Sequence, residues 1–157
     1  MTFRPYADHA RSARVLDDKR LGKQRVEAMQ IMSAMMAKLT GETGGWTNHP
    51  IVNMWAGLDN PYIDHACGQL HLRDLLDYYY ACRDEWRSRG FKHQMDYKIL
   101  PFSMIIQFTG PWQADHQLPW TSADEKRHKQ ILLRKDPDWY GQFWKRRPVL
   151  QELRVKG

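Results

Sequence analysis

The chain has 157 residues, of which 42% are hydrophobic and 27% charged, a composition that excludes wholesale disorder and favours one globular domain. No run of 18 apolar residues occurs and no apolar signal core follows Met1, so neither a membrane span nor a secretion signal is predicted. The net charge of +6 is concentrated at the two ends, with +4 in residues 4–25 and +7 in residues 126–157. Basic ends favour a polyanionic partner such as nucleic acid, although a solubilising surface is the alternative.

The first half of the chain predicts two long helices. Residues 1–11 are expected to form a basic, extended arm, and a helix is predicted over residues 12–39 with Ser12 as its N-cap. Apolar residues recur there at helical spacing and form one stripe, namely Leu21, Ala28, Met32, Met35 and Leu39. A glycine-rich loop separates this helix from a second one over residues 60–89, which begins at an Asn-Pro pair and ends before Gly90.

The second half is less regular. Prolines and glycines in residues 91–121 exclude a long helix there, so residues 102–108 are predicted as a short strand or a packed loop. A capping-box pattern predicts a third helix over residues 121–135, and a short helix follows in residues 137–144. The expected fold is all-α, a single compact domain over residues 1–157 with three main helices and long connecting loops.

The two cysteines, Cys67 and Cys82, fall in the second predicted helix, 15 residues apart. A helical rise of about 1.5 Å per residue separates them by roughly 22 Å, too far for a disulfide. Reduced, buried cysteines are typical of the cytoplasm, which is the expected location.

One face of the first predicted helix could carry chemistry. Arg20, Lys23 and Glu27 are spaced by three and four residues, so a helix places them on one side. Positive charge nearby favours an ionised Glu27, although a solvated Lys23–Glu27 pair is the simpler interpretation. The small Thr2 after Met1 permits removal of Met1, and a freed α-amine can attack an electrophilic sugar carbon to form an imine.

The C-terminal segment, residues 126–157, combines bases with aromatic residues. Cations can neutralise phosphates and aromatic faces can stack on unpaired bases, but these aromatic residues could instead anchor the segment to the core. The relevant side chains include Lys126, Arg127, Lys129, Arg134, Lys135, Trp139, Tyr140 and Trp144.

The sequence predicts neither a metal nor a cofactor. Cys67 and His71 are spaced as a possible ligand pair, but no further convincing pair, HExxH motif or paired CxxC motif accompanies them. Glycine-rich phosphate loops of the Walker or Rossmann type are missing as well.

Five segments of the sequence, taken together, form a recognisable motif set: TFRPY at 2–6, SARVLDDKRLGKQRVE at 12–27, NHP at 48–50, WRSRGF at 86–91 and LLRKDPDWY at 132–140. Together they resemble the endonuclease V type of pyrimidine-dimer DNA glycosylase, in particular its bacterial and phage branch. The resemblance spans most of the chain, and the run at 12–27 is specific.

The resemblance implies an all-helical, metal-free enzyme that removes a damaged base and cleaves the resulting abasic site. The implied nucleophile is the α-amine of the residue after Met1, here Thr2, and the assisting carboxylate of the first helix matches Glu27. An imine formed in this way acidifies the adjacent sugar proton, and β-elimination then cuts the strand.

Two departures from the family pattern leave alternatives open. Val26 stands before Glu27 where the family has an arginine, so Asp17 or Asp18 could be the acid. If Met1 is retained, Lys19 or Lys23 would supply the nearby amine.

The implied partner is double-stranded DNA with a damaged or modified base, bound by a monomer that flips the base out of the stack. The expected DNA-binding residues are Arg4, Arg20, Lys23, Arg25, Lys129, Arg134, Lys135, Trp139 and Tyr140. The alternatives are a nucleic-acid-binding protein without catalysis and a glycosylase for a different modified base.

Overall fold

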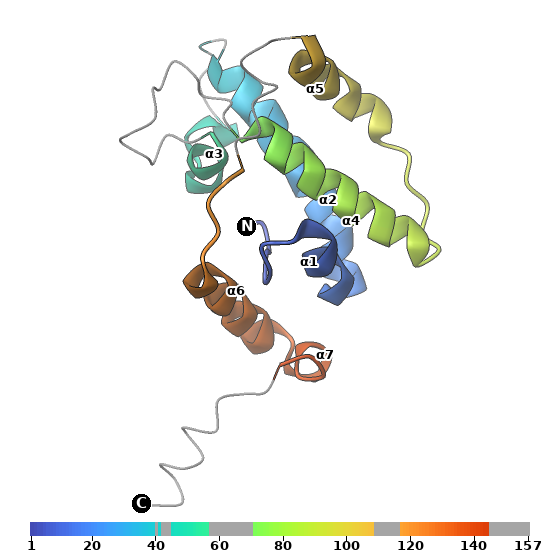
Figure 1. The fold of residues 1–157 in the computed structure, drawn as a ribbon. Coiled ribbons are helices and arrows are strands. Elements are labelled where there is room, and N and C mark those ends of the chain that lie inside the picture. Colours follow the sequence, from blue (N-terminus) through green and yellow to red (C-terminus); the bar gives the residue numbers. More distant parts are fainter. Residues whose placement is uncertain (40, 42–44, 57–70, 109–116, 145–157) are drawn as a thin grey trace, which may run out of the picture.

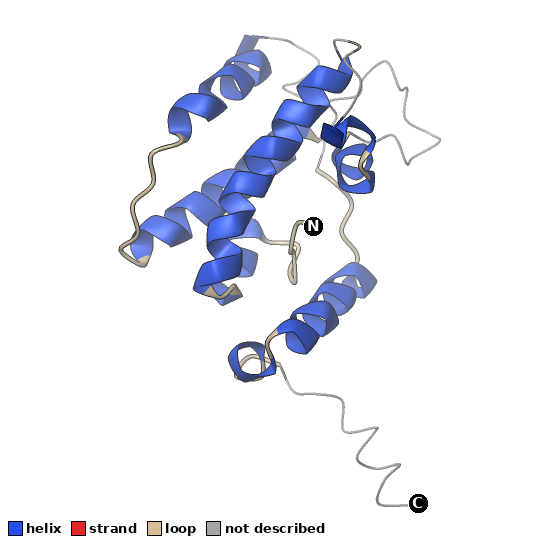
Figure 2. Ribbon diagram, turned by 180° about the vertical axis from the view of Figure 1, so that it is seen from behind, coloured by secondary structure: helices blue, strands red, loops and turns tan. Residues whose placement is uncertain are grey.

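The computed structural model describes residues 1–39, 41, 45–56, 71–108 and 117–144. Within these ranges every regular element is a helix, which confirms the predicted all-α class (Figure 2). The helices are α1 (His9–Val15), α2 (Asp18–Leu39), the 3-10 helix η1 (Gly45–Asn48), α3 (Pro50–Trp55), α4 (Leu72–Ser88), α5 (Asp96–Phe108), α6 (Ser122–Lys135) and α7 (Pro137–Tyr140). A search of the same ranges finds no helix long and apolar enough to cross a membrane.

The core lies between α2 and α4, which pack side by side at the centre of the molecule (Figure 1). Leu21, Ala28, Met32 and Met35 of the predicted stripe are fully buried on α2, where they meet buried residues of α4 such as Leu75. Burying such side chains contributes on the order of 2 kcal/mol each, which holds α2 in a fixed orientation. In both views the N-terminal end of the chain lies between the α2–α4 pair and α6.

The helix predicted over residues 12–39 is divided into α1 and α2, so the prediction was wrong at its start. Asp8, and not Ser12, caps α1, because its side chain accepts a hydrogen bond from the backbone N–H of Arg11 at 2.8 Å. Ser12 lies buried within α1. The chain is extended at Leu16, and the Asp17 carboxylate accepts from the backbone N–H of Arg20 at the start of α2.

Residues 102–108, predicted as a strand or loop, belong to helix α5 with Pro101 inside it. A proline costs a helix one backbone hydrogen bond and strains the preceding turn. Burial of Ile99 and Phe102 in the core offsets that cost.

The end of the second predicted helix and the start of the third are confirmed, whereas the short helix predicted over residues 137–144 ends already at Tyr140. Helix α4 ends at Ser88, and Gly90 follows with φ +89°, a conformation that glycine adopts without strain. Helix α6 opens with the predicted capping box, in which Thr121 and Asp124 exchange hydrogen bonds.

The expected start of the second helix near Asn60 lies outside the described residues, as does Cys67. Cys82 is a free thiol, and burial raises its pKa to about 12, so it stays protonated and unreactive at neutral pH.

Candidate active site at the N-terminal segment

The N-terminal segment, residues 1–5, lies within the fold: residues 2–5 are buried, and only Met1 is exposed. Thr2 is fully buried, and Phe3 and Arg4 are 8% and 3% exposed. The segment is fixed by hydrogen bonds from distant parts of the chain. On α3, the Trp55 indole donates to the Thr2 hydroxyl at 3.3 Å. On α6, His128 Nδ1 accepts from the Arg4 backbone N–H at 3.0 Å.

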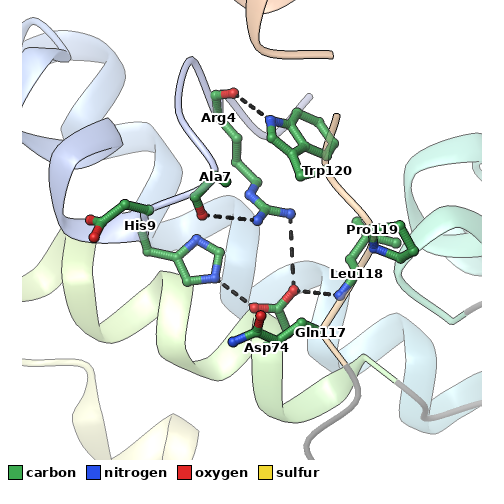
Figure 3. Close-up of a pocket in the computed structure, with 9 residues that line it drawn as sticks. Arg4, Ala7, His9, Asp74, Gln117, Leu118, Pro119 and Trp120 are labelled. Atoms are coloured by element: carbon green, nitrogen blue, oxygen red, sulfur yellow. Dashed lines mark hydrogen bonds and ion pairs between the residues drawn. The ribbon is translucent and has the colours of Figure 1, made fainter. Parts of the chain in front are cut away.

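The Arg4 side chain anchors the segment to Asp74 of α4 and to Trp120 (Figure 3). Its guanidinium donates to the Ala7 carbonyl at 3.2 Å and lies 3.9 Å from the Asp74 carboxylate. The Trp120 ring covers it at 4.5 Å, and the Trp120 indole donates to the Arg4 carbonyl at 2.8 Å. His9 completes the cluster through a 2.6 Å contact with Asp74. We conclude that Arg4 is a buried structural cation, since its expected role as a DNA contact does not fit this position.

Neighbouring groups shift the pKa values of Asp74 and Arg4 in this cluster. Burial alone would raise the pKa of Asp74, but the bond from His9, the backbone N–H of Leu118 and the Arg4 charge together hold it below its usual range. Burial lowers the pKa of Arg4, and the Asp74 charge opposes that effect. The Arg4–Asp74 ion pair requires an ionised Asp74. Protonation of Asp74 would leave the buried Arg4, which anchors the N-terminal segment, without its counter-charge.

The α-amine of Met1 lies 3.3 Å from Oε2 of Glu27. Gln24, one turn earlier on α2, joins the two groups: its side-chain N–H donates to the Met1 carbonyl at 3.1 Å and to Glu27 Oε2 at 3.2 Å. The Glu27 side chain is 24% exposed, so a ligand in solution can reach it. An amine and a carboxylate in contact at an accessible position are the two groups that imine chemistry needs.

These groups line a cleft of about 300 Å³. Its walls come from the N-terminal segment, from the first half of α2 and from the end of α6. The lining residues are Met1, Phe3, Lys19, Arg20, Lys23, Gln24, Glu27 and Lys135. Four basic side chains thus surround one carboxylate, an arrangement that attracts a phosphate backbone.

The two alternative acids, Asp17 and Asp18, have other partners. Asp17 is buried and bonded by the Tyr140 hydroxyl and by Arg20, and these bonds hold its pKa below the usual range although burial acts in the opposite direction. Asp18 is exposed and pairs with Arg89 at 2.9 Å. The carboxylate that faces the amine is that of Glu27.

A comparison with protein families supplies the context for this cleft. The family described as pyrimidine dimer DNA glycosylase matches residues 1–99, more than half of the chain, including the N-terminal segment and all of α2. The chain belongs to the pyrimidine dimer DNA glycosylase family. No curated protein and no solved structure gives a significant match. The family implies a DNA substrate, which is a polyanion.

The structure gathers three of the expected DNA-binding residues of this family member at the cleft, namely Arg20, Lys23 and Lys135. Arg20 is held by Asp17 at 3.1 Å, which directs its guanidinium, whereas Lys23 and Lys135 are exposed. Arg134 is exposed on α6 but does not line this cleft.

Arg25, Trp139 and Tyr140, which were also expected to bind DNA, make contacts within the fold. The Arg25 guanidinium stacks on the Trp86 ring at 4.2 Å and meets His93 at 2.7 Å, and burial lowers its pKa. Tyr140 is fully buried, and the Trp139 indole donates to the Val15 carbonyl at 2.8 Å. The aromatic pair therefore anchors α7 to the core, the alternative that the sequence left open.

Lys129 lies 4.5 Å above the Tyr6 ring, so its ammonium is already paired with an aromatic face. Among the residues that the structure describes, no group of three or more His, Cys, Asp or Glu side chains is placed to hold a metal ion.

Sequence reasoning missed the residues that hold the N-terminal segment. Gln24 could have been found, because it lies three residues before Glu27 and shares its helix face. Trp55, Tyr78 and His128 gave no local signal, since their contacts join residues 53 to 124 positions apart.

Proposed function

We propose that this protein is a DNA glycosylase with abasic-site lyase activity, which excises a damaged pyrimidine through an imine formed by its N-terminal amine. The observation that carries the proposal is the 3.3 Å contact between the α-amine of Met1 and Glu27, which brings the start of the chain to this carboxylate in a cleft lined by four basic residues. Membership of the pyrimidine dimer DNA glycosylase family supports the choice of substrate.

In the first step the neutral amine attacks C1′ of the damaged nucleotide. The bond from C1′ to the base breaks, and the base leaves with the electron pair and takes up a proton. The C1′–O4′ bond then breaks with its electron pair on O4′, which takes up the proton that Glu27 accepted from the amine, and the nitrogen becomes a protonated imine at C1′. The ionised Glu27 stabilises the positive charge on the sugar and accepts the proton that the amine loses.

In the second step the imine draws electrons from the sugar and acidifies a proton on C2′. Removal of that proton expels the 3′ phosphate and cuts the strand. Water then hydrolyses the imine and releases the amine. Arg20, Lys23 and Lys135 are positioned to neutralise the phosphates on either side of the nucleotide.

The working amine is assigned to Thr2 once Met1 has been removed. The Thr2 nitrogen is bonded to the Met1 carbonyl carbon, whose oxygen meets Gln24 beside Glu27, and the Thr2 hydroxyl is held by Trp55. Loss of Met1 therefore frees the nitrogen that is bonded to the carbonyl carbon whose oxygen Gln24 holds beside Glu27. A chain that keeps Met1 presents that residue's own α-amine to Glu27, so it does not need Lys19 or Lys23.

Borohydride trapping on a duplex with one abasic site tests the proposal. We expect a covalent adduct on the first residue, located by mass spectrometry, whose formation falls about 100-fold or more in Glu27→Gln. Glu85→Gln is the matched control, because Glu85 is 21% exposed, as Glu27 is 24% exposed, and pairs with Arg89 on α4. An adduct on Lys19 or Lys23 would contradict the assigned nucleophile, and salt-dependent binding without any adduct would indicate a non-catalytic DNA-binding protein.

The base preference is tested by comparing three duplexes: ultraviolet-irradiated, abasic, and substituted with a modified base. Strand cleavage of the first two is expected. Cleavage of the modified duplex without cleavage of the irradiated one would assign the enzyme to a different base.

A further inference from the structure

We infer that Gln24 and Tyr78 act together as positioning residues, which hold the N-terminal segment in register with Glu27. This inference rests on the proposed function, because it concerns how the proposed amine is placed. Neither residue is needed to donate or accept a proton in the reaction.

Gln24 is 1% exposed, and its side-chain amide uses every hydrogen-bonding position it has. Its oxygen accepts from the Phe3 backbone N–H at 3.0 Å and from the Tyr78 hydroxyl. Its nitrogen donates to the Met1 carbonyl at 3.1 Å and to Glu27 Oε2 at 3.2 Å. One side chain thus holds the segment at two backbone points and the carboxylate at a third, and the contacts with Phe3 and Glu27 do not involve Met1, so they persist when Met1 is removed.

The partners also fix which way the amide points. The Phe3 N–H can only donate, whereas the Met1 carbonyl and the Glu27 carboxylate oxygen accept. Turning the amide over would place two donors together at Phe3 and acceptors together at Met1 and Glu27. The orientation that serves the backbone is therefore the one that also directs a donor at Glu27.

Tyr78 supports this arrangement from the opposite helix, α4. It is fully buried, and its hydroxyl lies 3.0 Å from the Phe3 carbonyl and within hydrogen-bond distance of the Gln24 oxygen. Burial raises the pKa of Tyr78 well above its usual value, so the hydroxyl keeps its proton at any working pH. The Phe3 N–H is held by the Gln24 oxygen, and the single proton of the Tyr78 hydroxyl is shared between that oxygen and the Phe3 carbonyl, so a slide by one residue would break the contacts of Phe3 with both side chains.

Register matters here because the reacting atoms must meet at about 3–3.5 Å, and a displacement of about 1 Å can cost on the order of 100-fold in rate. A loosened segment would still bind DNA, because the cleft cations lie on α2 and α6. The inference therefore predicts a loss of chemical rate without a loss of affinity.

The neighbouring Tyr79 provides a matched control. It is also fully buried on α4, but its hydroxyl contacts His93 at 2.9 Å and Asp96 at 3.0 Å, away from the N-terminal segment. Tyr79→Phe removes the same atom from the same helix and leaves the positioning residues intact.

The kinetic test measures the single-turnover rate of strand cleavage at saturating abasic duplex, together with the Kd for that duplex. We expect the rate to fall at least 10-fold in Tyr78→Phe and in Gln24→Glu, which keeps the acceptor for Phe3 but turns the donor into an oxygen facing Glu27. The Kd should stay within about threefold of wild type, and Tyr79→Phe should match wild type in both quantities. Equal rates in Tyr78→Phe and Tyr79→Phe would overturn the inference.

A second test does not depend on activity. In Gln24→Ala the backbone N–H of Phe3 loses its acceptor, and we expect its hydrogen exchange to accelerate at least 10-fold. The N–H of Arg4, bonded to His128, serves as the internal reference and should stay protected. Unchanged exchange at Phe3 in Gln24→Ala would overturn the inference. If exchange at Phe3 accelerates in this variant but the wild-type protein forms no covalent adduct with DNA, only the proposed function is overturned.

Discussion

Glu27, Asp17 and Asp18 are acids of one short stretch of chain, and their surroundings separate their roles. Asp17 bonds to the start of α2 and to Tyr140, Asp18 forms a surface pair with Arg89, and Glu27 faces the α-amine. Val26, the residue before Glu27, is 37% exposed and does not line the cleft, so its side chain is not part of the candidate site. The missing arginine of the family pattern is therefore compatible with Glu27 as the proposed acid.

Lys23 and Lys135 allow the proposed phosphate contacts to be tested one at a time. Replacing either with glutamine should weaken DNA binding regardless of sequence and reduce the slope of log K against log salt by about 0.9 per lost contact. Fluorescence anisotropy between roughly 50 and 200 mM salt measures this slope.

Lys98→Gln on α5 is the control for that experiment, because Lys98 is exposed and does not line the cleft. It should leave the slope at the wild-type value. A Lys23 variant with the wild-type slope would show that DNA does not reach this part of the cleft.

Helix ends differ in how far the sequence predicts them. The ends of α4 and α6 depend on local signals, a glycine after the last turn and a capping box before the first, and both were predicted correctly. The break between α1 and α2 depends on Asp17 and Tyr140, which are 123 residues apart. The helix around Pro101 depends on burial against α2 and α4. Sequence patterns describe neighbours along the chain, so features that depend on distant partners escaped prediction.

The same distinction applies to the candidate site. Glu27 and the cations Arg20 and Lys23 follow from helical spacing, and the resemblance to a family added the amine. The approach of Lys135 from α6 and the burial of Arg4 follow from tertiary packing. No local pattern could have distinguished Arg4 as an internal cation from an exposed one.

Gly22 lies where α2 packs against the Trp86 ring of α4. A Cβ at this position would lie 3.0 Å from two atoms of the Trp86 ring. That ring cannot move away easily, because it stacks on Phe91 at 4.2 Å, carries Arg25 on its face and donates its N–H to the Lys92 carbonyl.

We therefore predict that Gly22→Ala destabilises the protein by about 1–2 kcal/mol, even though alanine favours helices by about 1 kcal/mol. Chemical denaturation measures the change. The double variant Gly22→Ala/Trp86→Leu should show a favourable coupling, since the smaller side chain makes room. A Gly22→Ala protein more stable than wild type would contradict the close contact.

At the scale of the whole molecule, His128 links α6 to the N-terminal segment. Its Nδ1 accepts from the Arg4 N–H, which requires a neutral ring at that nitrogen. Burial, helped by the Arg127 charge, lowers the pKa of His128 to about 4. The unfolded chain takes up this proton near pH 6.5 and the folded protein only near pH 4, so stability falls as pH falls across this interval.

Replacing His128 with glutamine keeps an acceptor for the Arg4 N–H but removes the titration. The loss of unfolding free energy between pH 7 and pH 4.5 should then be smaller than in wild type by about 2 kcal/mol. Denaturant unfolding at a series of pH values measures this difference. Carboxylates with lowered pKa values, such as Asp74, lose their contribution at lower pH in both proteins and cancel in the comparison. Identical pH profiles would exclude His128 as the titrating group.

The burial of Thr2 sets an order of events during synthesis. The first residues leave the ribosome early, yet the bond between Arg4 and His128 closes over a separation of 124 residues. At a synthesis rate of about 5–20 residues per second, His128 on α6 is made roughly 6–25 s after Arg4. During this time the N-terminal residues are accessible to processing enzymes. After folding, Met1 is exposed, but the residue on the other side of the Met1–Thr2 peptide bond is fully buried. We therefore expect removal of Met1, on which the proposed nucleophile depends, to precede the folding of α6 onto the N-terminal segment.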